Sequence, residues 1–203
     1  MFSGIIRNLG QVSGIKKNKN IVLEILTPEL ARISKLGDSV AVYGVCLTVV
    51  KRDAKKICFE LIPQTWKVTR LSQLKVKDKV NLEKSLKLKD YIDGHLLMGH
   101  VDGVAMVKSI INDKNLRAME FTPPLDLQRF IALRGGISIN GVSLTVSHLS
   151  EKTFSVSLTD YTLKHTNLGG LKVGGKVNLE VDMVGRYLDN LLKYQSKAKD
   201  FIK

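Results

Sequence analysis

The chain has 203 residues, 44% of them hydrophobic, and a formal net charge of +13. This length predicts one or two domains, each large enough for its own core, and no apolar run approaches the 18 residues of a membrane-spanning helix. Because the lysines are scattered and aromatic residues make up only 6% of the chain, the charge indicates solvated lysine-rich faces rather than a nucleic-acid platform.

The first half of the chain consists of short β-rich runs separated by turns. Loose apolar alternation over residues 4–26, around a polar turn at 16–20, predicts a β-hairpin. Thr27 and Pro28 predict the start of a short helix that ends near Leu36, before a glycine. Further strands are predicted at 40–42, 47–50, 57–61 and 79–82. Short strands at this spacing favour a small antiparallel barrel.

The second half repeats this order. A hairpin is predicted from 101–111 and 118–121 around a turn at 112–115, then a short helix from Thr122 that ends at Gly135 and Gly136. Later strands are predicted at 137–139, 143–146, 154–158 and 176–181. The linker between the halves is predicted near 85–91, where the chain is rich in lysine.

The two halves are copies of one another. At a constant offset of 97 and without a gap, residues 44–83 and 141–180 agree at 19 of 40 positions. Both copies begin with a similar run, GVCLTV and GVSLTV, and both end on KVNLE. Two copies of this length are too few and too long for a solenoid, so they predict a duplicated domain.

The pattern changes after Asp182. Apolar side chains then follow helical spacing, at Val184, Tyr187, Leu188, Leu191, Ala198 and Ile202. This amphipathic helix belongs to neither copy. It packs on its own barrel or on other subunits, and self-association is the preferred interpretation because an isolated helix is marginal without a partner.

Matched hydroxyl groups indicate two related polar pockets. Thr48 and Thr145, together with Ser143, lie in otherwise apolar strands, and Thr65 and Thr162 each follow a strand. Such hydroxyls are commonly exposed or hydrogen-bonded side chains, but their recurrence in both copies favours two equivalent pockets. The glycines at the start of each run, Gly44 and Gly141, fit a tight turn or the close approach of a planar ligand.

The copies differ at the residues best suited to chemistry. Cys46 stands where the second copy has Ser143, and a thiol is the better nucleophile or proton acceptor, although a buried small apolar role is the alternative. His95 and His100 lie among glycines, which suits proton transfer near neutral pH. A zinc site is a poor alternative, since no cysteine or carboxylate completes a ligand spacing nearby. Cys46 and Cys58 give no disulfide framework, and both are expected to be free thiols.

Four motifs in one order carry a family resemblance: MFSGII at 1–6, GVCLTV at 44–49, GH at 94–95 with GHVD at 99–102, and GVSLTV at 141–146. Over nearly all of its length the chain resembles riboflavin synthase of the α-chain type. The resemblance implies an all-β fold of two tandem six-stranded Greek-key barrels and a C-terminal helix that assembles a homotrimer. It implies that two molecules of 6,7-dimethyl-8-ribityllumazine exchange a four-carbon unit to give riboflavin and 5-amino-6-(D-ribitylamino)uracil, without cofactor or metal.

The resemblance also implies the site, which would form between barrels of adjacent subunits. The catalytic candidates are Cys46, His100, Ser143 and Thr145. One lumazine would bind in the first barrel against Cys46, Leu47, Thr48, Glu60, Leu61, Ile62, Pro63, Gln64 and Thr65. A second would bind in the other barrel against Ser143, Leu144, Thr145, Ser157, Leu158, Thr159, Asp160, Tyr161 and Thr162. The residues expected to close the site are Gly4, Ile5, Ile6, Gly99, His100, Val101 and Arg134.

The chain departs from the family pattern at a few positions. Tyr43 stands where asparagine is usual, Asn140 where aspartate is frequent, Arg134 replaces a common lysine and Asp93 a common glycine. The change at Asn140 removes a possible carboxylate from the acid–base chemistry. A rival interpretation is a non-catalytic lumazine- or flavin-binding protein of the same fold, in which one of the two motifs has usually decayed.

The predicted organisation is therefore a lumazine-binding barrel over residues 1–90, a second over 91–183 and a trimerisation helix over 184–203. The expected partners are two lumazines per site and two further copies of the chain, with the lumazine synthase that supplies the substrate as a possible addition. Neither nucleic acid nor a membrane is expected. The N-terminus lacks the pattern of a signal peptide, which predicts a cytoplasmic location.

Overall fold

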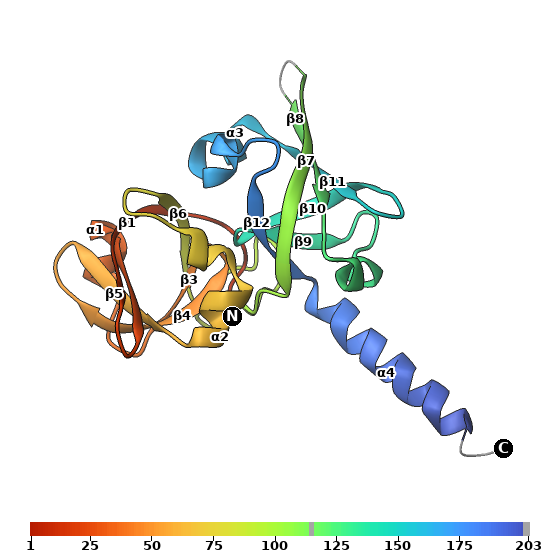
Figure 1. Ribbon diagram of the computed structural model, residues 1–203, viewed down its shortest axis with the longest axis horizontal. Helices are drawn as coiled ribbons and strands as arrows, with labels where there is room; N and C mark the ends of the chain where they lie inside the picture. The colour runs from red at the N-terminus through yellow and green to blue at the C-terminus, as the bar shows by residue number, and fades with distance from the viewer. Residues whose placement is uncertain (114–115, 201–203) are drawn as a thin grey trace.

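The computed structural model describes the backbone of residues 1–113 and 116–200, and the side chains of these except at 113, 116 and 196–200. It contains two closed barrels side by side and one long helix that leaves them (Figure 1). The predicted all-β duplicated fold is confirmed. Some predicted features lie outside the described part: residues 114 and 115 of the predicted turn, the side chain of Ala198 and the whole of Ile202.

Six antiparallel strands form the first barrel. They are β1 (Asn8–Lys17), β2 (Ile21–Leu26), β3 (Ser39–Val42), β4 (Val45–Arg52), β5 (Lys56–Leu61) and β6 (Lys79–Lys84). Around the barrel the order is β1-β2-β5-β4-β3-β6, and the non-sequential neighbours are those of a Greek-key connection. Alternate residues point inward, so that side chains such as Leu23, Phe59 and Leu82 are fully buried in one core.

The second barrel repeats this order with a core of its own. Its strands are β7 (Gly103–Asp113), β8 (Leu116–Thr122), β9 (Gly136–Ile139), β10 (Val142–Leu149), β11 (Phe154–Leu158) and β12 (Lys176–Val181). Met119, Phe121 and Phe154 are fully buried inside it, and the two phenylalanine rings stack with their centroids 5.4 Å apart.

The short helices differ in part from the prediction. The helix at Pro28 is α1 (Pro28–Ile33), which ends three residues before the predicted Leu36, and Thr27 makes no side-chain cap. In the second copy, residues after Pro124 form only a 3₁₀ helix, η2 (Leu125–Phe130). Four further elements were not predicted: α2 (Pro63–Val68), α3 (Asp160–His165), η1 (Arg70–Gln73) and η3 (Asn167–Gly170). These four elements are too short for a helical periodicity, and none of them follows a Thr-Pro pair like the one that predicted α1.

Asparagines from the repeated KVNLE run join the barrels. Asn81 of β6 donates from Nδ2 to the Asn140 carbonyl at 3.0 Å, and Asn178 of β12 donates to the Tyr43 carbonyl at 2.9 Å. Between them Gly44 and Gly141 lie back to back, and a Cβ built on Gly44 would lie 2.6 Å from the Gly141 nitrogen. The two barrels are thus related by a pseudo-twofold arrangement about a tight polar contact.

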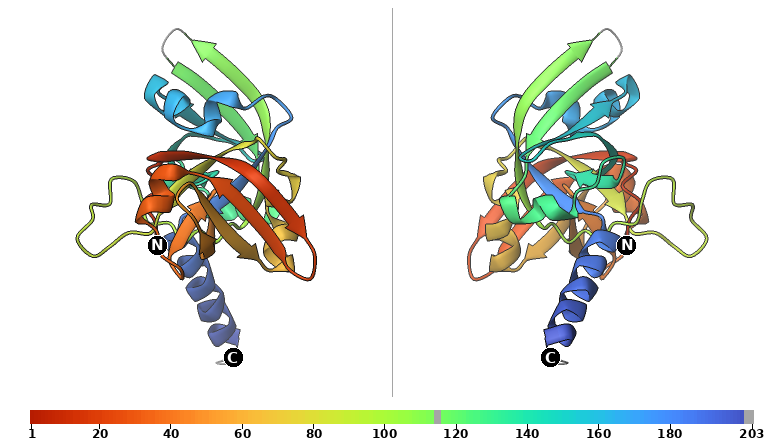
Figure 2. Two further views of the ribbon diagram at one scale, coloured as in Figure 1. Left: turned by 90° about the vertical axis from the view of Figure 1, so that its left-hand side faces the viewer. Right: turned by 90° about the vertical axis from the view of Figure 1, so that its right-hand side faces the viewer.

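The C-terminal helix α4 (Met183–Asp200) projects away from both barrels (Figures 1 and 2). Arg186 donates to Asp102 at 2.9 Å and Asp189 pairs with Arg129 at 3.5 Å, so these two residues mark the side of α4 that faces the barrel. The predicted apolar stripe lies on the other side, and its described members Val184, Tyr187, Leu188 and Leu191 are 54–63% exposed. These four side chains therefore do not pack on the barrel of their own chain. Among the described residues, no helix has the length and apolarity needed to cross a membrane.

Candidate active site

Two short segments, each preceding the first strand of one barrel, cross to the motif strand of the other. We call residues 2–6 the first crossed segment and residues 97–101 the second crossed segment. In the first, the Gly4 carbonyl accepts a hydrogen bond from the Ser143 N–H at 2.8 Å. In the second, the Gly99 carbonyl accepts one from the Cys46 N–H, also at 2.8 Å. Each half-site therefore contains residues from both copies.

Both crossing points require glycine. Gly4 and Gly99 have φ values of 75° and 73°, a region in which side chains are strained. A Cβ on Gly4 would lie 2.6 Å from the Ser143 Cβ, and one on Gly99 would lie 2.7 Å from the Cys46 Cβ. The backbone of each crossed segment therefore lies directly against the cysteine or the serine. Phe2 and Leu97 exchange backbone hydrogen bonds of 2.8 and 3.0 Å, which tie the two segments to each other.

The first half-site is built around Cys46 on β4. Its half-buried thiol packs against a small apolar cluster that contains Phe2, Ala41 and Leu97. Thr48 lies on the same strand with its side chain exposed, and Thr65 lies in α2. Cys58 is also a free thiol, but it pairs with Lys51 at the other end of β4 and takes no part in this cluster.

The second half-site is built around Ser143 on β10. Its hydroxyl lies 2.7 Å from Nδ1 of His95, and Nε2 of this histidine is buried with no partner among the described residues. Burial lowers the pKa of His95 from its ordinary value of 6.5, while the carboxylate of Asp182 acts in the opposite direction. A neutral imidazole next to the hydroxyl can accept the Ser143 proton, which makes this pair the best-formed acid–base arrangement in the site.

A cavity of about 520 Å³ opens beside the second half-site. Ile5 and Ile6 of the first crossed segment line one side, and Tyr161 and His165 of α3 line the other. The two aromatic rings stack with their centroids 4.0 Å apart. Arg7 and Lys164 also line this cavity, so it combines two positive charges with a flat aromatic surface that suits a planar heterocycle.

The other predicted site residues divide by exposure. Leu47, Leu61 and Leu158 are buried in the barrel cores, so only their backbone groups can face a ligand. Exposed side chains on or next to the strands belong to Glu60, Ile62, Pro63, Gln64, Thr145, Ser157, Thr159, Asp160 and Tyr161, while Leu144, Thr162 and Val101 are half-buried. His100 and Arg134 are also exposed, and Arg134 has a φ of 66° where the first copy has Gly37.

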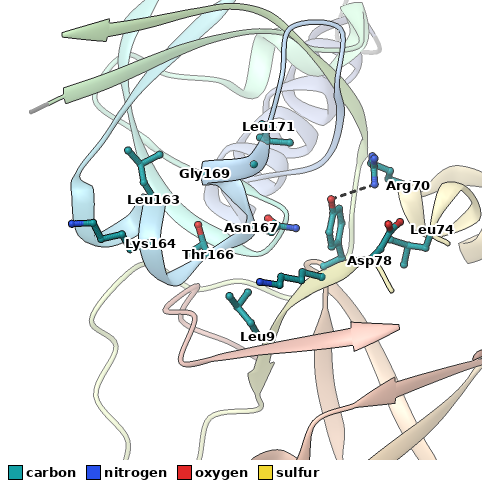
Figure 3. Close-up of a pocket in the computed structure, with 13 residues that line it drawn as sticks. Leu9, Arg70, Leu74, Asp78, Leu163, Lys164, Thr166, Asn167, Gly169 and Leu171 are labelled. Carbon is teal, nitrogen blue, oxygen red and sulfur yellow. Dashed lines mark hydrogen bonds between the residues drawn. The ribbon is translucent and has the colours of Figure 1, made fainter. Parts of the chain in front are cut away.

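A second cavity, of about 440 Å³, lies between the barrels but apart from these residues (Figure 3). Arg70, Leu74 and Asp78 line it from the first barrel, and Leu163 and Lys164 from the second. The Arg70 guanidinium donates to the Tyr43 hydroxyl at 3.2 Å. None of the predicted site residues is among those that line this cavity.

The sequence favoured His100 as the proton-transfer histidine. In the structure it is His95 whose Nδ1 lies within hydrogen-bond distance of the Ser143 hydroxyl. Both histidines lie between glycines, and no local signal separates them. Phe2 was noted only as part of a motif, and its contact with Cys46 required the tertiary structure. The described part of the chain holds no group of three or more histidine, cysteine, aspartate or glutamate side chains able to bind a metal.

Known proteins of one family are similar to this chain over nearly all of its length. The family model of the lumazine binding domain matches the chain twice, over residues 3–85 and 98–182. A riboflavin synthase of Chlamydia pneumoniae is 42% identical over 185 residues, which cover 90% of this chain and 90% of that protein. A riboflavin synthase of Brucella abortus is 37% identical over 201 residues, which cover 96% of this chain and all of that protein.

Solved structures of LumP are also similar. LumP complexed with riboflavin superposes with a TM-score of 0.83 at 30% sequence identity, covering 89% of this chain and 99% of that one. LumP complexed with 6,7-dimethyl-8-(1'-D-ribityl) lumazine gives a TM-score of 0.81 at the same identity.

Proposed function

The chain belongs to the riboflavin synthase family of two-domain lumazine-binding proteins, and on this premise we propose that it converts two molecules of 6,7-dimethyl-8-ribityllumazine into riboflavin and 5-amino-6-(D-ribitylamino)uracil. The observation that supports the proposal is that the same arrangement occurs in both copies. Each has its motif strand, its hydroxyl or thiol, and a crossed segment from the other copy held by a 2.8 Å hydrogen bond.

The reaction transfers a four-carbon unit from one lumazine to the other. The atoms of two substrates equal those of the two products, so no oxidant or reductant is consumed. One lumazine loses a proton from its C7 methyl group and attacks the other, which must first accept a nucleophile. In our proposal these roles fall to lumazines in different barrels, because the first barrel offers the Cys46 thiol and the second offers Ser143 with His95.

Placement of the two substrates supplies much of the rate enhancement. Holding two reactants in register contributes up to roughly 7–11 kcal/mol. We propose that the productive pair forms between barrels of adjacent subunits in a trimer, with the exposed stripe of α4 as the contact between subunits. In this arrangement Tyr161, the hydroxyls at Thr48 and Thr145, and the two crossed segments would contact the ligands.

The second candidate is a non-catalytic lumazine- or flavin-binding protein, which the similarity to LumP favours. One assay separates the two functions. Purified protein is incubated with 6,7-dimethyl-8-ribityllumazine, and riboflavin fluorescence is followed together with loss of substrate. We expect one riboflavin for every two lumazines consumed. Tight binding of lumazine with no turnover would assign the non-catalytic function instead.

A further inference from the structure

Each barrel ends in a buried carboxylate at the same position of its last strand. Glu83 of β6 and Glu180 of β12 are the final residues of the repeated KVNLE run. They are 7% and 3% exposed. No described lysine or arginine forms an ion pair with either group, so backbone and hydroxyl donors supply their hydrogen bonds.

These donors belong to the two crossed segments. Glu83 accepts the Ser3 N–H at 2.7 Å and the Ser3 hydroxyl at 2.8 Å with one oxygen, and the Gly4 N–H at 2.9 Å with the other. Glu180 accepts the Met98 N–H at 2.7 Å and the Gly99 N–H at 3.1 Å. Both oxygens of each carboxylate are used, and the two carboxylates bind equivalent residues of the two copies.

One residue separates each carboxylate from the opposite half-site. Gly4 donates its N–H to Glu83 of the first barrel and accepts the Ser143 N–H of the second barrel with its carbonyl. Gly99 is bonded in the same way to Glu180 of the second barrel and to Cys46 of the first. The position of each glutamate therefore determines how closely a crossed segment lies against a half-site that belongs to the other barrel.

A carboxylate is suited to this task because the segments are not strands. Their N–H groups point into a buried region without a ladder partner, and leaving such groups unpaired is costly. Two acceptor oxygens on one planar group satisfy consecutive N–H groups at once. Burial raises the pKa of Glu83 and Glu180, and the bonds from the segments act against this rise.

We propose that Glu83 and Glu180 are positioning residues with crossed effects: Glu83 fixes the half-site of the second barrel around Ser143, and Glu180 fixes the half-site of the first barrel around Cys46. The term half-site rests on the proposed function. The hydrogen bonds that link each glutamate to the motif strand of the other barrel are a property of the structure. Their effect can be tested without measuring turnover.

The test measures alkylation of a single thiol by iodoacetamide in the full-length protein. One background carries Cys58→Ser and reports on Cys46. The other carries Cys46→Ser, Cys58→Ser and Ser143→Cys and reports on position 143. Glu180→Gln keeps the size of the side chain but replaces one acceptor oxygen by an amide donor. It should raise the alkylation rate at position 46 on the order of tenfold, as expected for loss of one charge-assisted hydrogen bond, and leave position 143 unchanged.

Glu83→Gln should give the reverse result, with faster alkylation at position 143 alone. Glu120→Gln is the matched control, because Glu120 also accepts a serine hydroxyl, that of Ser109 at 3.0 Å, but lies on the outside of the second barrel. It should change neither rate. Equal acceleration at both thiols, or acceleration only in the barrel that carries the substituted glutamate, would overturn the proposal.

Ser3→Ala keeps the test decisive if a glutamine variant does not fold. It removes only the 2.8 Å hydroxyl bond to Glu83 and should raise the rate at position 143 by a smaller factor, with no change at position 46. No change at either thiol would count against the proposal. A separate assay of riboflavin formation by the unsubstituted protein tests the proposed function, so the two can fail independently.

Discussion

At the scale of single residues, the two copies differ in what surrounds the residue at the centre of each motif strand. Cys46 and Ser143 occupy the same position in the repeat. The thiol lies in an apolar cluster, whereas the hydroxyl lies within hydrogen-bond distance of His95. Under the proposed function, this difference would give the two lumazines different roles.

Cys46→Ser should lower turnover roughly 100-fold, the lower range for loss of a proton-transfer group, while affinity for riboflavin changes little. Folding should survive, because the second copy already carries serine at this position. Steady-state kinetics and riboflavin titration measure the two effects. Cys58→Ser is the control and should leave both unchanged, since Cys58 lies outside the Cys46 cluster. Full activity of Cys46→Ser would reduce Cys46 to a packing residue.

His95 should impose an acid limit on turnover. Its pKa is lowered from 6.5, so it is neutral at pH 7 and becomes protonated only as the pH falls below that value. The same shift stabilises the fold above pH 6.5, and this contribution is lost as the pH falls through the folded-state pKa. In His95→Gln, turnover at neutral pH should fall and the acid limb should flatten.

Profiles of kcat against pH measure this effect, with two histidine variants for comparison. His100→Gln tests the histidine favoured by sequence, and His148→Gln is a control on the exposed face of β10. We expect the acid limb to persist in both. If only His100→Gln lost the acid limb of the kcat profile, His100 would be the proton-transfer histidine.

Replacing Arg134 or Lys77 by glycine should change stability in the same way but activity differently. Both are exposed, with positive φ values of 66° and 81°, and each stands opposite a glycine of the other copy, Gly37 or Gly174. Relief of ~1–2 kcal/mol of strain exceeds the ~0.5–1 kcal/mol that glycine adds to the unfolded-state entropy. Arg134→Gly and Lys77→Gly should therefore both raise the free energy of unfolding by up to about 1 kcal/mol.

Only Arg134→Gly should also lower turnover, because Arg134 is a predicted ligand contact and Lys77 is not. Urea unfolding gives the stability and the riboflavin assay gives the activity. If both variants kept full activity, Arg134 would not contact the substrate.

At the scale of elements, α4 carries an apolar stripe that contacts within the described chain do not bury. Its polar side holds Arg186 and Asp189 against the second barrel, and its apolar stripe faces away. Burying each large side chain of the stripe is worth roughly 1.5–3 kcal/mol, which contact with neighbouring subunits would supply.

Leu188→Asp combined with Leu191→Asp should dissociate the protein to monomers. The variant should still bind riboflavin but lose most activity, because the productive pair of lumazines would no longer form between subunits. Sedimentation and turnover are measured together. Asn190→Asp, which adds an acid beside the stripe, is the control and should remain assembled. A monomeric variant with full activity would place the whole site within one chain.

At the scale of the whole molecule, each barrel is closed by itself, but the two are joined by hydrogen bonds at their motif strands. Each closes its own hydrogen-bonded ring and has its own core. Each half-site nevertheless uses a backbone carbonyl from the other copy. Each barrel therefore has a ring and a core of its own, while the backbone around Cys46 and Ser143 is shared between the two copies.

A fragment of residues 1–90 should fold as a barrel, because it contains β1 to β6. It should bind riboflavin more weakly than the full chain, since the second crossed segment at Gly99 is absent, and it should not turn lumazine over. Circular dichroism, fluorescence titration and the riboflavin assay report these three properties. Efficient synthesis of riboflavin by the fragment would contradict a site built from two barrels.

The sequence by itself determined the repeat, the all-β barrels, the C-terminal amphipathic helix and the motifs at Cys46 and Ser143. These depend on local alternation, turn residues and self-similarity, which a linear pattern retains. Helices α2 and α3 were missed because six residues give too little periodicity, and neither follows a Thr-Pro pair like the one that marked α1. The number of strands and the reaction came from a family resemblance rather than from the pattern.

Only the tertiary structure decided which residues meet. The choice of His95 over His100 as the partner of Ser143, and the hydrogen bonds of Glu83 and Glu180 to the crossed segments, join residues 48 to 82 positions apart. The outward direction of the α4 stripe depends likewise on the pairing of Arg186 with Asp102. Contacts of this kind depend on how the strands close into barrels and how the barrels pack. The local sequence around each residue therefore does not predict them.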